Sequence, residues 1–446
     1  MASLLFRNAE IVTDGTRVVG DVLVRDGRIA AVGRVSGAAD REVEARGKLL
    51  LPGLIDDQVH FREPGLTHKA DIASESRAAV AGGVTSFMEM PNTVPNTVTR
   101  EALEAKFARA AATSVANHSF FLGATHHNLE EIKRMDTRRV CGVKIFMGSS
   151  TGDLLVDDAA VLERIFAHAP TPIATHCEDT PMIKGAEAAA RARWGEDVPA
   201  AEHARIRSAE ACYKSSLLAV NLARRTNARL HVLHITTAQE VSLFNPGTLR
   251  GKRVTAEACA HHLWFDDRDY ARLGHRIKCN PAIKEPADRA AIRRAVAEGR
   301  IDVLATDHAP HTAEEKAGTY FKAPAGLPLI QHSLLMFLDL WRQGVLPVET
   351  IVQRACHAPA EIFGVVDRGH IRPGMWADLV LVDPETPTTV TPDKILYKCG
   401  WSPMEGHTFG CSVAMTVVNG HVAYEDGRLR PDAPMGRALE FLPDRR

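Results

Sequence analysis

Both ends of the chain show short runs in which apolar and polar residues alternate. The runs contain β-branched residues and end at Asp-Gly, Asn-Gly or Gly turns, a combination typical of β-strands joined by tight turns. Because such strands occur at both ends, we predict one small β-sandwich domain built from residues 1–53 and 366–446. Its expected strands lie in residues 4–15, 21–33, 377–383 and 414–427.

Residues 54–365 have a different pattern, in which apolar runs of strand length alternate with segments of 3.6-residue periodicity. Eight such strand-then-helix units predict an α/β fold, a closed parallel (β/α)8 or TIM barrel. The helices are clearest in residues 71–83, 157–167 and 286–299. The predicted barrel strands lie in residues 49–60, 83–90, 118–123, 142–147, 172–176, 229–235, 254–262 and 302–308.

Five residues with ligand or acid–base chemistry fall at the ends of these predicted strands. They end the first, fourth, fifth, sixth and eighth strands and are His60, Lys144, His176, His234 and Asp307. A single histidine at a strand end is more often a hydrogen-bonded structural residue than a ligand. Five such residues at the carboxyl ends of barrel strands would meet at one mouth, where barrels carry their active sites. The set therefore predicts a metal-dependent hydrolase.

Lys144 is the unusual member, because an ammonium group cannot ligate a cation and a buried lysine needs a compensating interaction. Carbamylation by CO2 would turn its amine into a carboxylate-like group that can bridge two divalent ions about 3.5 to 4 Å apart. Two other interpretations stay open. Lys144 could extend its charge to solvent, or it could act as a neutral base with a depressed pKa.

The nitrogen- and oxygen-rich ligand set contains no sulfur and favours zinc, as one or two ions, over calcium or magnesium. Zinc lowers the pKa of a bound water to about 7 and so makes a nucleophile available at neutral pH. Asp307, beside the metal, is then the natural residue to shuttle the proton.

The composition limits the classes of partner that we expect but does not indicate a function. Lysine plus arginine number 54 against 55 aspartate plus glutamate, so no net field indicates a nucleic-acid or membrane partner, and we expect a small-molecule substrate. The eight cysteines form no CxxC pair, which predicts reduced thiols. Neither a signal peptide nor an apolar run of about 18 residues is found, so we expect a cytoplasmic protein.

Several motifs together resemble the amidohydrolase superfamily and, within it, the dihydroorotases. The resemblance covers nearly the whole chain. It implies reversible ring closure of N-carbamoyl-L-aspartate to L-dihydroorotate, a step of pyrimidine synthesis. The motifs are HFREPG from His60, MPNT from Met90, GVKIFMG from Gly142, THCED from Thr175, LHITT from Leu233 and ATDHAPH from Ala305.

The dihydroorotate ring carries a carboxylate, which needs a fixed cation with hydrogen-bond donors beside it. Arg62, two residues after His60, can grip a carboxylate with its planar guanidinium, and Asn92 adds an amide donor. The resemblance adds His311 to this clamp, and it places Asn280 and the loop 323–326 near the substrate. It also implies that allantoinases and hydantoinases, which share the metal centre, lack the arginine.

One departure concerns the first strand, where the family usually has His-x-His and this chain has Gln58 before His60. Gln58 could coordinate weakly, lower the affinity of that metal position or mark a one-metal enzyme. We expect its side chain to point inward with that of His60.

Two alternatives to an active dihydroorotase therefore stay open. One is a catalytically degenerate barrel that serves as structural partner of a carbamoyltransferase, and the other is a related cyclic amidase such as an allantoinase or hydantoinase. The retention of the other site residues favours the enzyme. A homodimer is the expected assembly. The segment 182–207 is a candidate for substrate gating or subunit contact, and the pair His261–His262 for a structural or substrate-contacting role.

Overall fold

Eight parallel strands form the centre of the protein in this computed structural model, which describes residues 3–148, 154–430, 435–443 and 445. They neighbour one another in chain order, as expected for a barrel. The first and last strands close the circle, because Val59 pairs with His308 and the backbone N–H of His60 donates to the carbonyl of His308 at 2.7 Å. The strands are β6 (Leu54–Val59), β7 (Val84–Glu89), β8 (Asn117–Gly123), β9 (Gly142–Phe146), β10 (Ile173–His176), β11 (Leu230–Val232), β12 (Val254–Cys259) and β13 (Val303–Ala305).

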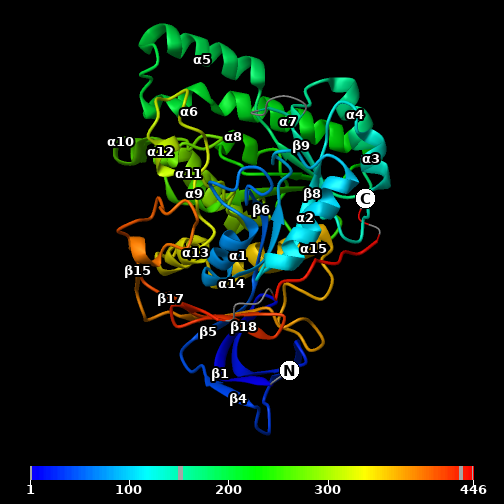
Figure 1. The fold of residues 1–446 in the computed structure, drawn as a ribbon, viewed down its shortest axis with the longest axis vertical. Helices are drawn as coiled ribbons and strands as arrows, with labels where there is room; N and C mark the ends of the chain where they lie inside the picture. Colours follow the sequence, from blue (N-terminus) through cyan, green and yellow to red (C-terminus); the bar gives the residue numbers. More distant parts are fainter. Residues whose placement is uncertain (1–2, 149–153, 431–434, 444, 446) are drawn as a thin grey trace.

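Strands from both ends of the chain form a second, mixed sheet of nine strands, which lies below the barrel in Figure 1. Apolar side chains from β1, β2, β3, β5, β14 and β17 pack into one core, so the predicted two-layer sandwich is a single mixed sheet with its own core. Asn419 and Gly420 both have positive φ and make the predicted tight turn between β17 and β18. The strands are β1 (Leu4–Thr13), β2 (Thr16–Arg25), β3 (Arg28–Gly33), β4 (Arg41–Glu44), β5 (Leu49–Pro52), β14 (Leu379–Asp383), β17 (Ser412–Val418), β18 (His421–Glu425) and β19 (Arg428–Leu429).

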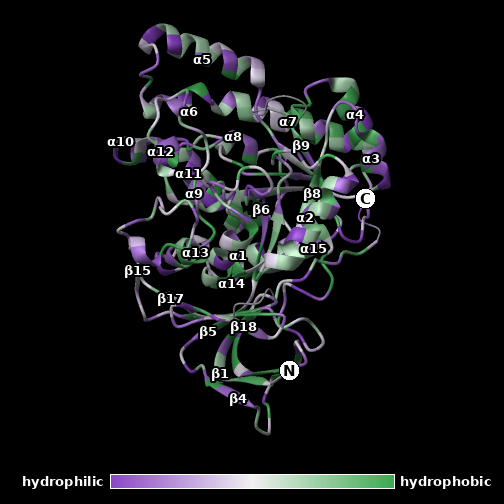
Figure 2. Cartoon of the chain, viewed as in Figure 1, coloured by the Kyte–Doolittle hydropathy of each residue, from purple (hydrophilic) through white to green (hydrophobic). Residues whose placement is uncertain are grey.

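Helices surround the barrel, and the outer ones, such as α5, alternate hydrophilic and hydrophobic residues along their length (Figure 2). The three helices predicted most clearly from the sequence are present as α1, α4 and α11. The Asp71 side chain caps α1 by accepting from the backbone N–H of Ser74. The helices are α1 (Ile72–Ala81), α2 (Arg100–Thr113), α3 (Leu129–Arg134), α4 (Ala159–His168), α5 (Thr180–Trp194), α6 (His203–Ile206), α7 (Ala209–Thr226), α8 (Ala238–Val241), α9 (Ala260–Trp264), α10 (Tyr270–Leu273), α11 (Pro286–Glu298), α12 (Ala313–Lys316), α13 (Ser333–Arg342), α14 (Val348–Val352) and α15 (Ala358–Phe363).

Two predicted strands differ from the structure. The run 49–60 is two strands in different sheets, separated at Gly53, where a Cβ atom would lie 2.1 Å from Oγ1 of Thr85. The seventh barrel strand ends at Cys259, so His261 and His262 belong to α9 rather than to the strand. In both places one continuous apolar run in the sequence crosses the boundary between two elements, so the pattern alone does not show where the first element ends.

Part of the C-terminal region packs on the barrel. A two-stranded arm, β15 (Thr388–Thr389) with β16 (Thr408–Phe409), precedes β17. Further along the chain, the backbone of Leu439 bonds to that of His118, and the guanidinium of Arg445 donates to the carbonyl of Cys141. The label for the C-terminus in Figure 1 accordingly lies beside the barrel helices. No helix among the described residues is both long and apolar enough to span a membrane.

Candidate active site

A cavity of about 100 Å³ opens at the carboxyl ends of the barrel strands. Eight of the nine predicted site residues line it, and the ninth, His311, contacts the lining residue Arg62. The fold therefore brings together residues that are up to 250 positions apart in the sequence. The lining residues are Gln58, His60, Arg62, Asn92, Lys144, Phe146, His176, His234, Asn280, Asp307, Ala309, Ala325 and Gly326.

His60 and Asp307 form the first pair of candidate ligands. Oδ1 of Asn92 lies 2.7 Å from Nδ1 of His60 and accepts its proton, so the lone pair of His60 is on Nε2. That Nε2 lies 3.1 Å from Oδ1 of Asp307. Burial lowers the pKa of His60, although the hydrogen bond and the charge of Asp307 oppose the shift, and at this distance a cation, either a proton or a metal ion, can lie between the two atoms. The pair fits a divalent metal ion.

His176 and His234 form the second pair. Oε2 of Glu178 accepts the proton of His176 Nε2 at 2.8 Å, so Nδ1 of His176 carries the lone pair and lies 3.0 Å from Nε2 of His234. Burial lowers the pKa of both rings, and the nearby Lys144 charge lowers them further. Two neutral imidazoles whose nitrogens converge in this way can hold one divalent ion.

Lys144 lines the same cavity as these two pairs, and its residue surface is 1% exposed. Within the described parts of the chain, its Nζ has no hydrogen-bond or ion-pair partner. The ring of Phe146 lies 4.6 Å away. Burial lowers the pKa of Lys144 to about 8, although the charges of Asp307 and Glu257 oppose the shift. At pH 7 about a tenth of the amine is therefore neutral, the form that reacts with CO2, against a far smaller fraction for an exposed lysine.

Gln58 points into the cavity, as predicted. Its Nε2 donates to Oδ1 of Asp307 at 3.1 Å, and its Oε1 lies 3.8 Å from Sγ of Cys259. The strand has a bulge here, because the pairing of β6 with β7 shifts register between Asp56 and Val59. Gln58 thus orients Asp307 from the place where the family usually has an imidazole ligand.

Three of the site residues have a backbone conformation that L-residues rarely adopt. The φ angles are 67° at Arg62, 38° at His234 and 47° at Asp307. Such residues cost about 1–3 kcal/mol each and persist only where surrounding contacts hold them. At His234 the contact is a hydrogen bond of 3.0 Å from its backbone N–H to Oε1 of Glu257. Strain at three cavity residues supports a functional role for the cavity.

Sequence reasoning missed the carboxylates that support the histidines. Glu178 holds His176, and the guanidinium of Arg207 holds Glu178 through a contact of 2.5 Å between Nη1 and Oε2. Burial alone would raise the pKa of Glu178, but the charge of Arg207 and the hydrogen bond from His176 lower it to about 2. The available signal was the acidic residue two positions after His176 in the THCED motif.

We expect Glu178→Gln to weaken metal binding at this pair by about 10–100-fold, because a residue that orients a ligand histidine contributes on that scale. Titration of the metal-free protein with zinc would measure the effect. Glu202→Gln is the matched control, because Glu202 pairs with Arg205 in the same segment, away from the cavity. Equal zinc affinity in both variants would contradict the role of Glu178.

Arg62 and His311 lie together at the edge of the cavity. Lys69 donates to Nδ1 of His311 at 3.0 Å, so Nε2 of His311 carries the proton and donates to the carbonyl of Ala325, also at 3.0 Å. Nη2 of Arg62 lies 3.1 Å from that Nε2. Two donor groups therefore converge, and no carboxylate of the described residues lies within ion-pair distance of Arg62. The guanidinium of Arg62, which lines the cavity, is therefore the group that can bind an anion there.

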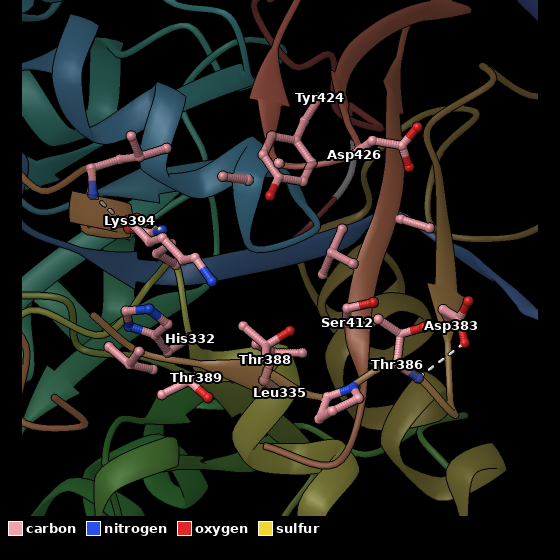
Figure 3. A pocket seen from close by; sticks show the side chains of 18 of the residues that line it. His332, Leu335, Asp383, Thr386, Thr388, Thr389, Lys394, Ser412, Tyr424 and Asp426 are labelled. Atoms are coloured by element: carbon pink, nitrogen blue, oxygen red, sulfur yellow. Dashed lines mark hydrogen bonds between the residues drawn. The ribbon is translucent and has the colours of Figure 1, made fainter. Parts of the chain in front are cut away.

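A larger cavity, of about 560 Å³, lies where the terminal sheet faces the barrel helices (Figure 3). None of the predicted site residues lines it. Of its three lining aspartates, Asp383 is already paired with Lys48 at 2.5 Å and accepts from the backbone N–H of Thr386. The converging imidazoles and the buried cation of the smaller cavity have no counterpart among its lining residues, so the smaller cavity is the candidate active site.

Comparisons with known proteins agree with this assignment of the fold. A model described as the Amidohydrolase family matches residues 49–423. The chain is 35% identical over 421 residues to a dihydroorotase from Halobacterium salinarum, covering 92% of this chain and 96% of that protein. It is 32% identical over 444 residues to an allantoinase from Bacillus velezensis, with 98% and 97% covered. The solved structure of an L-hydantoinase (dihydropyrimidinase) from Arthrobacter aurescens is similar with a TM-score of 0.93 at 26% identity, with 99% and 100% covered.

Proposed function

The chain belongs to the amidohydrolase family and is a cyclic amidohydrolase, and from this premise we propose that it is a dihydroorotase. It would interconvert L-dihydroorotate and N-carbamoyl-L-aspartate in pyrimidine synthesis. The observation that carries the proposal is the buried guanidinium of Arg62, which faces the cavity beside His311 and lacks a carboxylate partner among the described residues. A substrate carboxylate would supply that partner, and the rings of allantoin and hydantoin carry none.

In this proposal the residues that would hold zinc are His60 and Asp307 on one side of the cavity and His176 and His234 on the other. Lys144, as a carbamate, would lie between them. The fit rests on the converging ring nitrogens and carboxylate and on Nζ of Lys144, which has no hydrogen-bond or ion-pair partner among the described residues. When bound, divalent zinc would activate water and polarise the substrate carbonyl.

Asn92 and Arg62 would orient the ring. Asn92 uses its Oδ1 for His60, which leaves its amide N–H groups for the substrate. Arg62 is held by the carbonyl of Pro310, to which its Nε donates at 3.1 Å, so its terminal nitrogens stay directed at the cavity edge. Together the two residues would turn the amide bond of the ring toward Asp307.

Asp307 would take the proton from the attacking water and deliver it to the ring nitrogen that departs. Its Oδ1 already accepts from Gln58, and the hydrogen bond with His60 lowers its pKa against the opposing effect of burial. Asp307→Asn should therefore lower kcat by about 10²–10⁴-fold, the usual contribution of a positioned acid–base group. Normal turnover by this variant would rule out the role.

The proposal is tested by assaying the purified chain in both directions, on L-dihydroorotate and on N-carbamoyl-L-aspartate, with metal content measured on the same sample. Allantoin and hydantoin serve as matched substrates without the carboxylate. We expect turnover of the first pair only. Turnover of allantoin instead would identify an allantoinase, and metal-free, inactive protein would support the structural-partner alternative.

A further inference from the structure

Three ionisable side chains meet in the barrel interior, outside the lining of the active-site cavity. They are Asp57 on β6, His231 on β11 and Glu257 on β12, and all three are 0% exposed. Nε2 of His231 lies 3.1 Å from Oδ2 of Asp57 and 3.8 Å from Oε2 of Glu257. One ligand atom from each residue lies within 4.8 Å of the other two. Each of the three is a residue type that binds metal ions in proteins.

The neighbouring Thr255 determines which nitrogen of His231 carries the proton. Oγ1 of Thr255 donates its own hydrogen to the carbonyl of Leu230 at 3.2 Å, so it accepts from Nδ1 of His231 at 2.8 Å. Nδ1 therefore carries a proton. Nε2, which faces both carboxylates, is the atom left to bind a cation.

The contact between His231 and Asp57 is short, but its angle lies outside hydrogen-bond geometry. Burial would lower the pKa of His231, yet the two carboxylates raise it to about 9, so this position favours a cation. Nε2 of His231, both carboxylate oxygens of Asp57 and Oε2 of Glu257 have no hydrogen-bond partner among the described residues. At 3.1 Å without a hydrogen bond, a proton on Nε2 would be poorly aligned with the carboxylate of Asp57. A metal ion with bonds of about 2.0–2.2 Å places neighbouring ligand atoms roughly 3 Å apart and off that axis. The observed distances therefore match a metal ion at this position better than a shared proton.

Two further features aim the carboxylates at this point. The bulge in β6 between Asp56 and Val59 lets Asp57 reach His231 while the next residue, Gln58, reaches the cavity. Glu257 uses its other oxygen, Oε1, to accept from the backbone N–H of His234 and from the thiol of Cys259. Two hydrogen bonds therefore hold Oε1 of Glu257 in place, and Oε2 remains available to coordinate an ion.

From these contacts we propose that Asp57, His231 and Glu257 form a buried binding site for a divalent transition-metal ion, separate from the ligands in the active-site cavity. One imidazole and two carboxylates suit zinc, manganese or iron(II) rather than a soft monovalent ion. The ion balances two carboxylates that otherwise have no counter-charge except a protonated His231. Because no ligand atom is exposed, the ion is taken up during folding and exchanges slowly with chelators.

The test uses the full chain produced with zinc, dialysed against a chelator, and its metal content measured by mass spectrometry. We expect Asp57→Asn to hold one metal equivalent fewer than the wild type. The matched control is Asp56→Asn, because Asp56 is the adjacent buried carboxylate and bonds to the hydroxyl of Thr306 at 2.6 Å. Asp56→Asn should contain as much metal as the wild type. His176→Ala should keep the one metal equivalent per chain that remains bound after dialysis against the chelator.

Anomalous diffraction from wild-type crystals at the metal edge gives a readout that needs no variant. We expect a peak between Nε2 of His231, Oδ2 of Asp57 and Oε2 of Glu257. Absence of that peak, or an unchanged metal content in Asp57→Asn, would overturn the proposal. Nitrogen NMR would then find both ring nitrogens of His231 protonated. Catalytic activity enters neither measurement, so failure here is separate from failure of the proposed dihydroorotase activity.

Discussion

Lys144→Ala is expected to lower kcat/KM by about 10³-fold or more, because loss of a group that holds the metals removes several kcal/mol and each 1.36 kcal/mol is a factor of ten. Acetate or propionate should restore part of the activity. Either acid would fill the space of the missing side chain and supply the two oxygens of the carbamate. The dependence of kcat/KM on acid concentration, at fixed pH and ionic strength, measures the rescue.

The matched control for this rescue is Lys133→Ala, because Lys133 is a surface lysine that pairs with Glu130 on α3. It should keep full activity and show no response to the acids. Mass spectrometry of the wild-type protein should also find one CO2 adduct. Lys144→Ala that does not respond to acids, together with wild-type protein that lacks the adduct, would establish Lys144 as an ordinary amine.

Arg62→Met is expected to lower kcat/KM for dihydroorotate by about 10²–10³-fold. Each hydrogen bond to a charged group contributes about 1.5–3 kcal/mol, and the guanidinium can make two of them with one carboxylate. Arg62→Lys should recover only part of the loss, because an ammonium group cannot make both bonds in one plane. Steady-state kinetics in both directions measures the change.

Dihydrouracil, the same ring without the carboxylate, provides the matched comparison for Arg62. Its turnover by the wild type should be poor and should not fall further in Arg62→Met. The ratio of the two kcat/KM values therefore isolates the carboxylate contact from any general loss of structure. Equal losses for both substrates would mean that Arg62 supports the fold of the cavity edge rather than substrate choice.

The barrel could be predicted because eight apolar runs alternate with helical periodicity, and the positions of α1, α4 and α11 followed from the same pattern. The change of sheet at Gly53 could not. It depends on how closely the chain passes Thr85, which is a tertiary contact. Likewise, the apolar run through Ala258, Cys259 and Ala260 contains no residue that ends a strand, so the start of α9 was hidden.

The candidate ligands could be predicted because the mouth of a barrel collects the residues at strand ends. His60 follows β6 directly, whereas His234 and Asp307 lie two residues beyond β11 and β13. Lys144, which we predicted at the end of its strand, instead lies inside β9, two residues before its last residue. Their supporting residues follow no such rule. Glu257 lies within β12, and Arg207 comes from a helical segment about thirty positions after its partner Glu178, so only the folded chain shows what they contact.

The ion pair between Arg207 and Glu178 links the segment that contains α5 and α6 to His176. If that segment moved away, a buried carboxylate would lose its counter-ion at the same moment as a candidate metal ligand lost its orientation. Thermodynamic linkage makes such a connection reciprocal. Any ligand that holds Arg207 against Glu178 would then tighten the hold on an ion at His176, and the ion would tighten the hold on that ligand by the same factor.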